Sequence, residues 1–208
     1  MFIRYSDSIT QNMDNLTPSL LPIFRSRQQA ELLALLLGDP DLEVSVSDLA
    51  ARLSVPYASV HREVERAESS GVLRSRKIGN TRLVSAQTES PYFDGLSSVV
   101  TRAFGVPAVL ARALNGVTNI RAAYVFGSWA SQYMGGAAER PVQDIDVLIL
   151  GAPDRDVVYD CIEPLSERLG RPVQVTIRGA EWLDEGDGSF HDSVIRRPMV
   201  RVPLSEGE

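Results

Sequence analysis

Residues 144–150, DIDVLIL, restrict the possible fold more than any other segment of this sequence. Their strongly apolar, alternating pattern predicts a β-strand. Because side chains alternate across a strand, Asp144 and Asp146 should project from one face, and Ile145 and Val147 from the other. One strand is therefore expected to contribute to an apolar core on one side and to present two carboxylates on the other. The alternative is an exposed strand edge with two solvated carboxylates, which the apolar residues on both sides of the pair disfavour.

The carboxylate pair is a candidate metal site. Two carboxylates a few ångströms apart repel each other, which raises the pKa of one of them unless a cation lies between them. Mg²⁺ is the expected cation, because it prefers oxygen ligands and is usually held by one or two carboxylates together with substrate phosphates. Asp144 and Asp146 are therefore candidate metal ligands and catalytic residues.

A second candidate element precedes the pair. A β-prone run over residues 122–126 ends in Gly127 and Ser128, and a helix over 129–134 is predicted to follow. Glycine allows the backbone to approach a phosphate closely, while the serine hydroxyl and a helix N-terminus offer hydrogen-bond donors. Gly127 and Ser128 are thus candidate nucleotide-binding residues. A plain N-cap role for Ser128 is the alternative and is compatible with phosphate binding.

The N-terminal half has a different pattern. Apolar residues at helical spacing predict three helices, over residues 27–37, 45–53 and 57–71. Ser26 is expected to cap the first helix, and Ser45 or Ser47 the second. Two extended segments follow, 72–77 and 81–86, and Gly79-Asn80 between them suits the positive φ angles of a hairpin turn. Three helices followed by a two-stranded ribbon is the order of a winged helix-turn-helix.

This order predicts a surface for double-stranded DNA. The third helix would enter the major groove with residues near its N-terminal end, namely Tyr57, Ser59, His61 and Arg62. Arg62 is the best candidate for a bidentate contact to guanine. The wing would bring cations to phosphates or to the minor groove, namely Arg74, Arg76, Lys77 and Arg82. Taken singly, each arginine is equally well explained as an ordinary solvated side chain.

Two features of the third helix bear on this prediction. Glu63, Glu65 and Glu68 make the helix locally acidic, so they either face away from DNA or weaken its binding. His61 is disfavoured as a metal ligand, because no cysteine and no second histidine lies near it in the sequence.

The stretch YVFGSWAS…DIDVLILG resembles the signature of the DNA polymerase β-like nucleotidyltransferase superfamily, in which an apolar strand, Gly-Ser and a helix precede an Asp-apolar-Asp strand. The resemblance covers about residues 117–200. It implies a nucleoside triphosphate bound through the Gly-Ser turn, two divalent metals held by the carboxylates, and transfer of a nucleoside monophosphate. Together with the winged helix, the chain resembles bacterial regulators in which an ArsR-like winged helix is fused to a minimal nucleotidyltransferase domain.

The sequence departs from that family pattern in two places. The loop between Ser128 and Asp144 is longer than usual. Active members also carry a third carboxylate on a later strand, and in RPVQVTIR the matching position is Gln174. Glutamine is neutral, a weak metal ligand and no base, while Glu181 has the wrong spacing for the same strand face. Nucleotide binding is therefore expected to survive better than transfer chemistry.

The predicted fold class is α+β, in four parts: an N-terminal arm, a winged helix-turn-helix domain, a connecting helical segment and a small α/β nucleotidyltransferase-like domain with a mixed sheet, over residues 1–22, 23–88, 89–115 and 116–208. The connecting segment should form two helices broken near residues 105–107, and its apolar residues could form either a homodimer interface or core between the domains. The last part should contain a helix over 154–169 and a strand over 172–177, followed by a helix and a tail.

Composition narrows the function classes. A net charge of −6 argues against coating nucleic acid by bulk attraction. The longest aliphatic run, residues 32–37, is far shorter than a membrane span, and the N-terminus has no apolar signal region, so no membrane partner is expected. Cys161 is the single cysteine and cannot form an internal disulfide, which fits a reducing cytoplasm; a small half-buried apolar role is expected for it.

Three functions remain open. The first is a cytoplasmic transcriptional regulator whose nucleotidyltransferase-like domain binds a nucleotide as a signal. The second is a working nucleotidyltransferase of the toxin–antitoxin type, which modifies a protein partner or a small molecule and uses the winged helix for autoregulation. The third is a scaffold in which both modules are degenerate. The replacement of the third acid by Gln174 favours the first.

Overall fold

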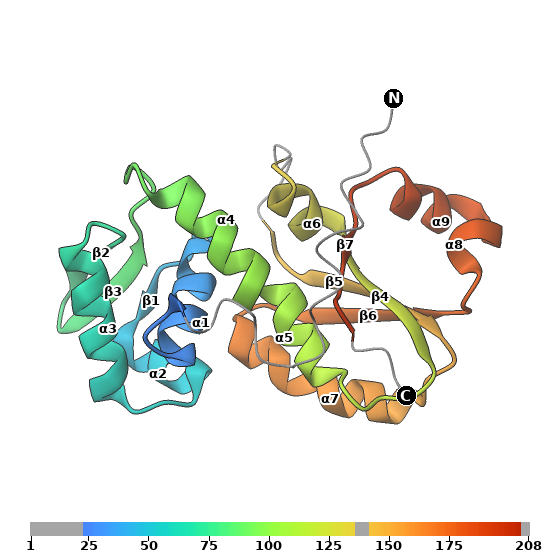
Figure 1. Cartoon of the computed structure of the whole chain (residues 1–208), viewed down its shortest axis with the longest axis horizontal. Helices are drawn as coiled ribbons and strands as arrows, with labels where there is room; N and C mark the ends of the chain where they lie inside the picture. The colour runs from blue at the N-terminus through green and yellow to red at the C-terminus, as the bar shows by residue number, and fades with distance from the viewer. Residues whose placement is uncertain (1–22, 136–141, 205–208) are drawn as a thin grey trace.

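The computed structural model of this chain describes residues 23–135 and 142–204, so the predicted N-terminal arm lies outside the described residues. Within these ranges the fold is a mixed α+β arrangement with two sheets, one of them mixed. Figure 1 shows the sheets toward opposite ends of the long axis, with α4 (Phe93–Phe104) and α5 (Val106–Ala113) running between them. No helix in the described ranges is both long enough and apolar enough to cross a bilayer.

The N-terminal lobe, residues 23–104, contains the three predicted helices and the predicted hairpin. Its elements are α1 (Arg27–Leu37), β1 (Val44–Ser45), α2 (Val46–Leu53), α3 (Tyr57–Ser69), β2 (Leu73–Ile78) and β3 (Thr81–Ala86). The strands form an antiparallel sheet in the order β1-β3-β2, and β2 and β3 are joined by the predicted turn. Gly79 has the expected positive φ, at +58°, whereas the prediction of a positive φ at Asn80 is wrong. Strand β1 was not predicted, because two residues are too short to show a period.

Side-chain caps explain where the first two helices begin. Ser26 Oγ accepts a hydrogen bond from the Gln29 amide, and Ser45 Oγ accepts one from the Asp48 amide, so Ser45 rather than Ser47 caps α2. Helix α3 ends at Ser69, with Ser70 as its C-cap, two residues before the predicted end at Gly71.

The connecting segment divides at Gly105, as predicted, and its two helices belong to different cores. Val100 and Phe104 of α4 are buried with the helices of the N-terminal lobe. The buried residues of α5 instead pack against the second sheet, together with α7. The apolar positions of this segment therefore serve mainly in the separate cores of the two lobes, whereas the prediction placed them at a homodimer interface or in a core between the domains. A homodimer stays a prediction.

The C-terminal lobe, residues 106–204, holds the second sheet. Its elements after α5 are β4 (Ile120–Phe126), α6 (Gly127–Tyr133), β5 (Ile145–Gly151), α7 (Arg155–Leu169), β6 (Val173–Arg178), α8 (Trp182–Glu185), α9 (Gly188–Ile195) and β7 (Val200–Arg201). The sheet order is β6-β5-β4-β7, with β5 and β6 parallel and the other pairs antiparallel. Strand β7 and the division of the last helix into α8 and α9 were not predicted.

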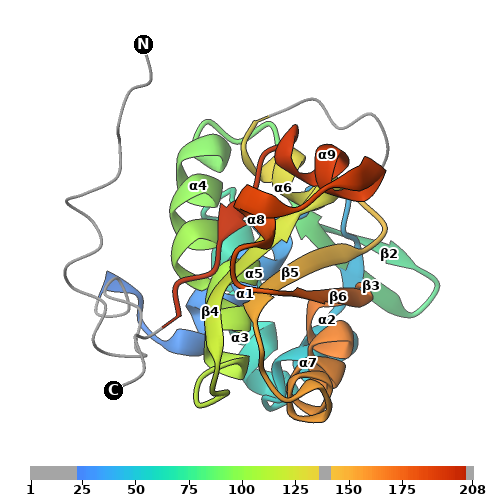
Figure 2. The same cartoon turned by 90° about the vertical axis from the view of Figure 1, so that its right-hand side faces the viewer.

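Helices cover both faces of this sheet. Ile145, Val147 and Ile149 of β5 are buried in the cluster that includes α5 and α7. Leu148 and Leu150 face the opposite side, where they pack with residues of α8 and α9. Figure 2 shows α8 and α9 lying over one side of the sheet. The predicted alternation of β5 is therefore confirmed, and it places Asp146 on the α8–α9 side.

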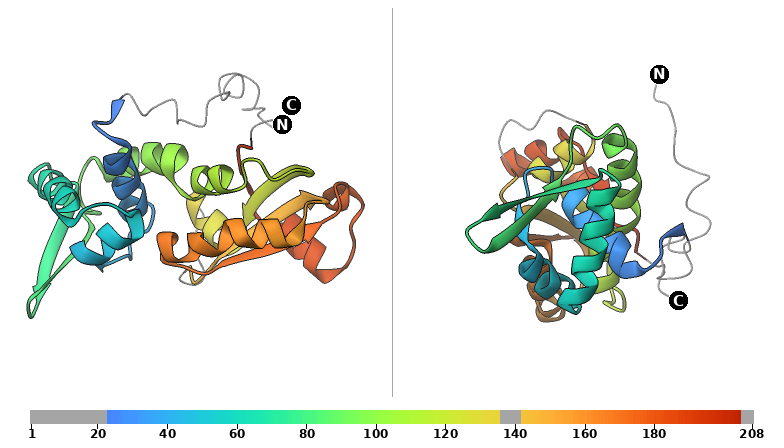
Figure 3. Two further views of the ribbon diagram at one scale, coloured as in Figure 1. Left: turned by 90° about the horizontal axis from the view of Figure 1, so that it is seen from below. Right: turned by 90° about the vertical axis from the view of Figure 1, so that its left-hand side faces the viewer.

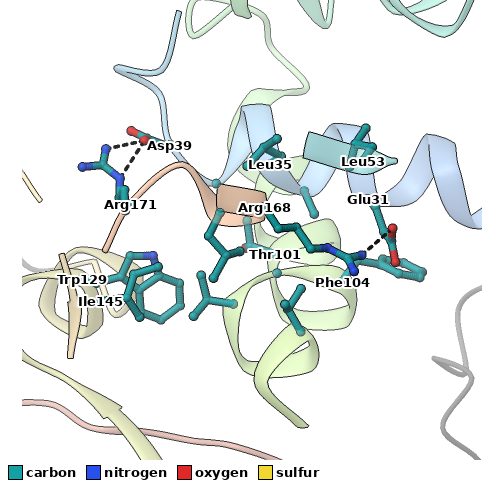
Figure 4. A pocket seen from close by; sticks show the side chains of 16 residues that line it. Glu31, Leu35, Asp39, Leu53, Thr101, Phe104, Trp129, Ile145, Arg168 and Arg171 are labelled. Carbon is teal, nitrogen blue, oxygen red and sulfur yellow. Dashed lines mark hydrogen bonds and ion pairs between the residues drawn. The ribbon is translucent and has the colours of Figure 1, made fainter. Parts of the chain in front are cut away.

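Charged contacts join the two lobes. The carboxylate of Glu31 on α1 forms ion pairs with Arg112 on α5, at 3.1 Å, and with Arg168 on α7, at 2.8 Å. Asp39 accepts hydrogen bonds from Arg171 nearby. Figure 4 shows the Glu31–Arg168 and Asp39–Arg171 pairs beside a cavity, which Leu35 and Leu53 line from one lobe and Trp129 and Ile145 from the other. The volume of this cavity is about 60 Å³.

Replacing Glu31 by glutamine should lower the free energy of unfolding by about 2 kcal/mol. Glu31 is only 11% exposed, and burial already lowers the pKa of Arg112, so losing the carboxylate leaves a poorly solvated cation. Breaking a buried pair costs about 3–5 kcal/mol, and the partial hydration of Arg168 reduces this here. Urea unfolding followed by tryptophan fluorescence measures the change.

Glu65→Gln is the matched control. Glu65 is 55% exposed, and its one ion pair in the described part of the chain is with His61 at 3.5 Å. Its replacement should change the free energy of unfolding by less than about 0.5 kcal/mol. Equal effects of the two substitutions would contradict a stabilising role for the contact between lobes.

Candidate functional site

The turn from β4 into α6 forms one wall of the candidate site. Gly127 has φ +74°, and a Cβ atom there would overlap Asp146 Oδ2, so only glycine lets this backbone lie against the carboxylate. Helix α6 begins at Gly127, with Phe126 as N-cap, two residues before the predicted helix. The alternative role of Ser128 as a plain N-cap is therefore wrong. Its side chain lies in the first turn and forms no hydrogen bond within the described part of the chain.

The two aspartates lie next to this turn. Asp146 is paired with Phe126 of β4 on one side and with Gln174 of β6 on the other. Asp144 immediately precedes β5, which starts at Ile145, whereas the prediction placed it inside the strand. Gln174 Nε2 donates a hydrogen bond to Asp144 Oδ2 at 2.7 Å. The fold therefore brings Gly127, both aspartates and Gln174 together.

The electrostatics of the pair are unfavourable without a cation. Burial raises the pKa of Asp146 above its ordinary value, and the negative charge of Asp144 raises it further. In residues 23–135 and 142–204, no arginine, lysine or histidine forms an ion pair with either aspartate. A bound cation would remove this repulsion.

The donor set fits a metal that is only partly coordinated by protein. No group of three or more acidic, histidine or cysteine side chains in the described ranges could hold a metal ion. Asp144 and Asp146 alone suit a single Mg²⁺, because Mg²⁺ commonly takes one or two carboxylates and completes its shell with phosphate oxygens and water. Glu181 cannot supply a third acid. It is the N-cap of α8, beyond the opposite end of β6 from Gln174.

The predicted DNA-binding residues lie on α3 and on the β2–β3 hairpin, which Figure 3 shows projecting from the N-terminal lobe. Tyr57, Arg62 and Lys77 are exposed. Ser59 and His61 are half-buried; Ser59 Oγ accepts a hydrogen bond from Arg62, and the His61 ring packs beside Tyr57.

The wing arginines are held by partners within the lobe. Arg76 forms hydrogen bonds with both carboxylate oxygens of Glu43, and Arg82 forms an ion pair with Glu68. Arg74 Nε donates to Ser85 Oγ at 3.2 Å. The sequence indicated the cations but not these partners, because the paired residues lie far apart in the chain.

The acidic residues of α3 do not form a continuous exposed surface. Glu63 is paired with Arg66 one turn later, and Glu68 is paired with Arg82, so two of the three are neutralised. Glu65 alone is largely exposed, near His61. The Glu63–Arg66 pair could have been found from its spacing of three residues on a helix.

Comparisons of this chain with protein-family models, with curated proteins and with solved structures found no match. The function is therefore inferred from the residues described above.

Replacing Asp146 by asparagine should increase the stability of the metal-free protein at neutral pH. A raised pKa means that the folded chain holds this proton more tightly than the unfolded chain does. The protonated Asp146 side chain therefore contributes to stability below the ordinary pKa of aspartate, and this contribution is lost as the pH rises through the raised pKa. Urea unfolding in EDTA should give a higher free energy of unfolding for Asp146→Asn than for the wild type near pH 7. This difference should vanish in acid.

Asp160→Asn serves as the control, because Asp160 is exposed on α7 and should show no such pH-dependent gain. A variant Asp146→Asn that is less stable than wild type at neutral pH would show that the ionised carboxylate has a stabilising partner.

Proposed function

We propose that this chain is a DNA-binding transcriptional regulator whose C-terminal lobe binds a Mg-nucleoside triphosphate as a signal. The observation that carries the proposal is the hydrogen bond from Gln174 to Asp144. It places an amide beside the carboxylate pair, where the resemblance to nucleotidyltransferases expects a third acid. The pair can then bind a metal-nucleotide, while the site has no general base at that position.

The nucleotide would lie against the β4–α6 turn. The backbone of Gly127 allows close approach of a phosphate. The hydroxyl of Ser128, which forms no hydrogen bond within residues 23–135 and 142–204, can donate one to this phosphate. Asp144 and Asp146 would hold the Mg²⁺, which neutralises phosphate charge when bound. Gln174 orients Asp144 by donating to Oδ2 and cannot accept a proton from an attacking group.

The DNA would contact the N-terminal lobe, at the other end of the molecule from the proposed nucleotide site. Arg62 lies exposed in the N-terminal half of α3, the half from which a recognition helix contacts base edges. Lys77 lies exposed near the tip of the hairpin. The ion pairs to Glu43 and Glu68 hold Arg76 and Arg82 in fixed orientations, so their contribution to DNA requires sharing or exchanging these partners. Because the chain has a net charge of −6, DNA binding must depend on the local surface formed by α3 and the hairpin.

The contact between lobes supports a link between the two sites. Ile145 lies between the two aspartates and lines the cavity at the interface, and Trp129, which also lines it, directly follows Ser128. Figure 4 shows both side chains at this cavity. A ligand that shifts β5 or α6 would therefore change the shape of the cavity that Leu35 and Leu53 of the N-terminal lobe also line.

A working nucleotidyltransferase with a protein or small-molecule acceptor is the second candidate. The close approach of Gly127 to Asp146 supports it, because a triphosphate bound at this turn would lie next to the carboxylates, as transfer requires. Release of pyrophosphate distinguishes the two candidates.

Calorimetric titration with each nucleoside triphosphate in Mg²⁺ tests the nucleotide site. We expect binding by the wild type, a loss of at least about tenfold in affinity in Asp144→Asn/Asp146→Asn, and no pyrophosphate release in the same samples. Asp160→Asn should bind like the wild type. Pyrophosphate release that depends on the aspartates would instead establish the enzyme, and absence of any binding would overturn the proposal for this lobe.

Replacing Arg62 by alanine should weaken binding to duplex DNA carrying the sequence upstream of the coding region by about tenfold, because a base contact of this kind contributes about 1–3 kcal/mol. Lys77→Ala should weaken binding to this duplex and to a random duplex alike, since a phosphate contact carries no sequence information. Anisotropy titrations at physiological salt measure both, with Arg197→Ala as an exposed control outside the N-terminal lobe. Equal affinity of the wild type for both duplexes would rule out a sequence-specific regulator.

A further inference from the structure

Aromatic side chains surround the candidate site on the α8–α9 side of the sheet. Phe126 ends β4 and is paired with Asp146 in the strand register. Phe190 of α9 meets the Phe126 ring edge-on, with centroids 6.1 Å apart, and lies 5.6 Å from the ring of Trp182. A row of rings therefore begins at the residue beside the carboxylate and continues away from it.

Phe190 differs from its neighbours in being exposed. It is 40% exposed, whereas Phe126 and Trp182, whose rings it contacts, are partly buried. A single exposed apolar residue needs no explanation, and Ile195 on the same helix is 47% exposed. Phe190 is distinguished by its contacts with two aromatic rings, those of Phe126 and Trp182. Phe126 is also the residue that is paired with Asp146 in the sheet.

The positively charged side chain of Arg178 lies close to this ring. The guanidinium carbon of Arg178 lies 5.6 Å from the Phe190 centroid and 5.7 Å from that of Trp182. Its Nη1 donates to the carbonyl of Ile177, and no ion pair with an acidic group is formed in the described ranges. No carboxylate in the described ranges therefore neutralises the Arg178 guanidinium, and its other N–H groups are available to a ligand.

The distance between the carboxylate pair and Arg178 suits a nucleotide that contacts both. Gln174, opposite Asp146, and Arg178 lie four residues apart on β6, which corresponds to about 13 Å along a strand. The sugar and base of a nucleotide can extend over this length when its phosphates lie at the carboxylates.

We propose that Phe190 and Arg178 form the base-binding end of the nucleotide site and select purine nucleotides. This inference rests on the proposed nucleotide site and names its ligand class. The base stacks on the exposed Phe190 ring, and Arg178 donates to N7, an acceptor that both purines carry. Purines also present the larger stacking surface.

The test compares the binding of Mg-ATP, Mg-CTP and Mg-tripolyphosphate to the full chain by calorimetry. Tripolyphosphate has the phosphates but no base. Phe190→Leu removes the ring and retains apolar volume, and Ile195→Ala is the control on the same helix. Circular dichroism and urea unfolding check that each variant folds.

We expect the wild type to bind Mg-ATP at least about tenfold more tightly than Mg-CTP. Phe190→Leu should lose about tenfold for Mg-ATP and nothing for Mg-tripolyphosphate, and Ile195→Ala should change neither. Arg178→Ala should reduce the preference for ATP over CTP. Equal binding of ATP and CTP, or an unchanged ATP affinity in Phe190→Leu, would overturn the base site while leaving the phosphate site intact. Absence of binding by all three ligands would overturn both proposals.

Discussion

Strand β5 has to satisfy two opposite environments, because its side chains alternate between the faces of the sheet. Ile145, Val147 and Ile149 are buried against α5 and α7, and a slip of one residue would place Asp146 in that core. The register with β4 and β6 fixes the strand, and the same register brings Asp146 beside Phe126 and Gln174. The core and the candidate site therefore both depend on the register of β5 with its two neighbouring strands.

The two lobes depend on a different kind of contact. Their apolar cores are separate, and they meet through Glu31 and Asp39 with three arginines, beside a small cavity. Ion pairs of this kind hold an orientation without the close packing that makes a core rigid. Ile145 and Trp129 reach this interface from the segments that carry Asp144, Asp146 and Ser128. In the proposed regulator, these residues would connect the nucleotide site to the interface between the lobes, because they are adjacent in the chain to Asp144, Asp146 and Ser128.

Much of this arrangement could be predicted from local patterns. The helices of the N-terminal lobe, the hairpin turn at Gly79, the break at Gly105 and the alternation of β5 all follow from periodicity and from the backbone preferences of glycine. Strands β1 and β7 escaped prediction because two residues show no period. The start of α6 was misplaced because a helix that includes Gly127 at φ +74° has no sequence signal at its first residue. The pairs Glu43–Arg76 and Glu31–Arg168 depend on tertiary packing, which residue spacing does not encode.

The most direct test of a nucleotide-sensing regulator is thermodynamic linkage between its two ligands. The affinity of the full chain for its upstream DNA should be measured with and without saturating Mg-nucleoside triphosphate, and the affinity for the nucleotide with and without DNA. Coupled sites commonly change each other's affinity by about 5–150-fold, and the two factors must be equal. We predict a reciprocal change of at least about fivefold. Binding of both ligands with no change in either affinity would contradict the regulator and leave two independent binding sites on one chain.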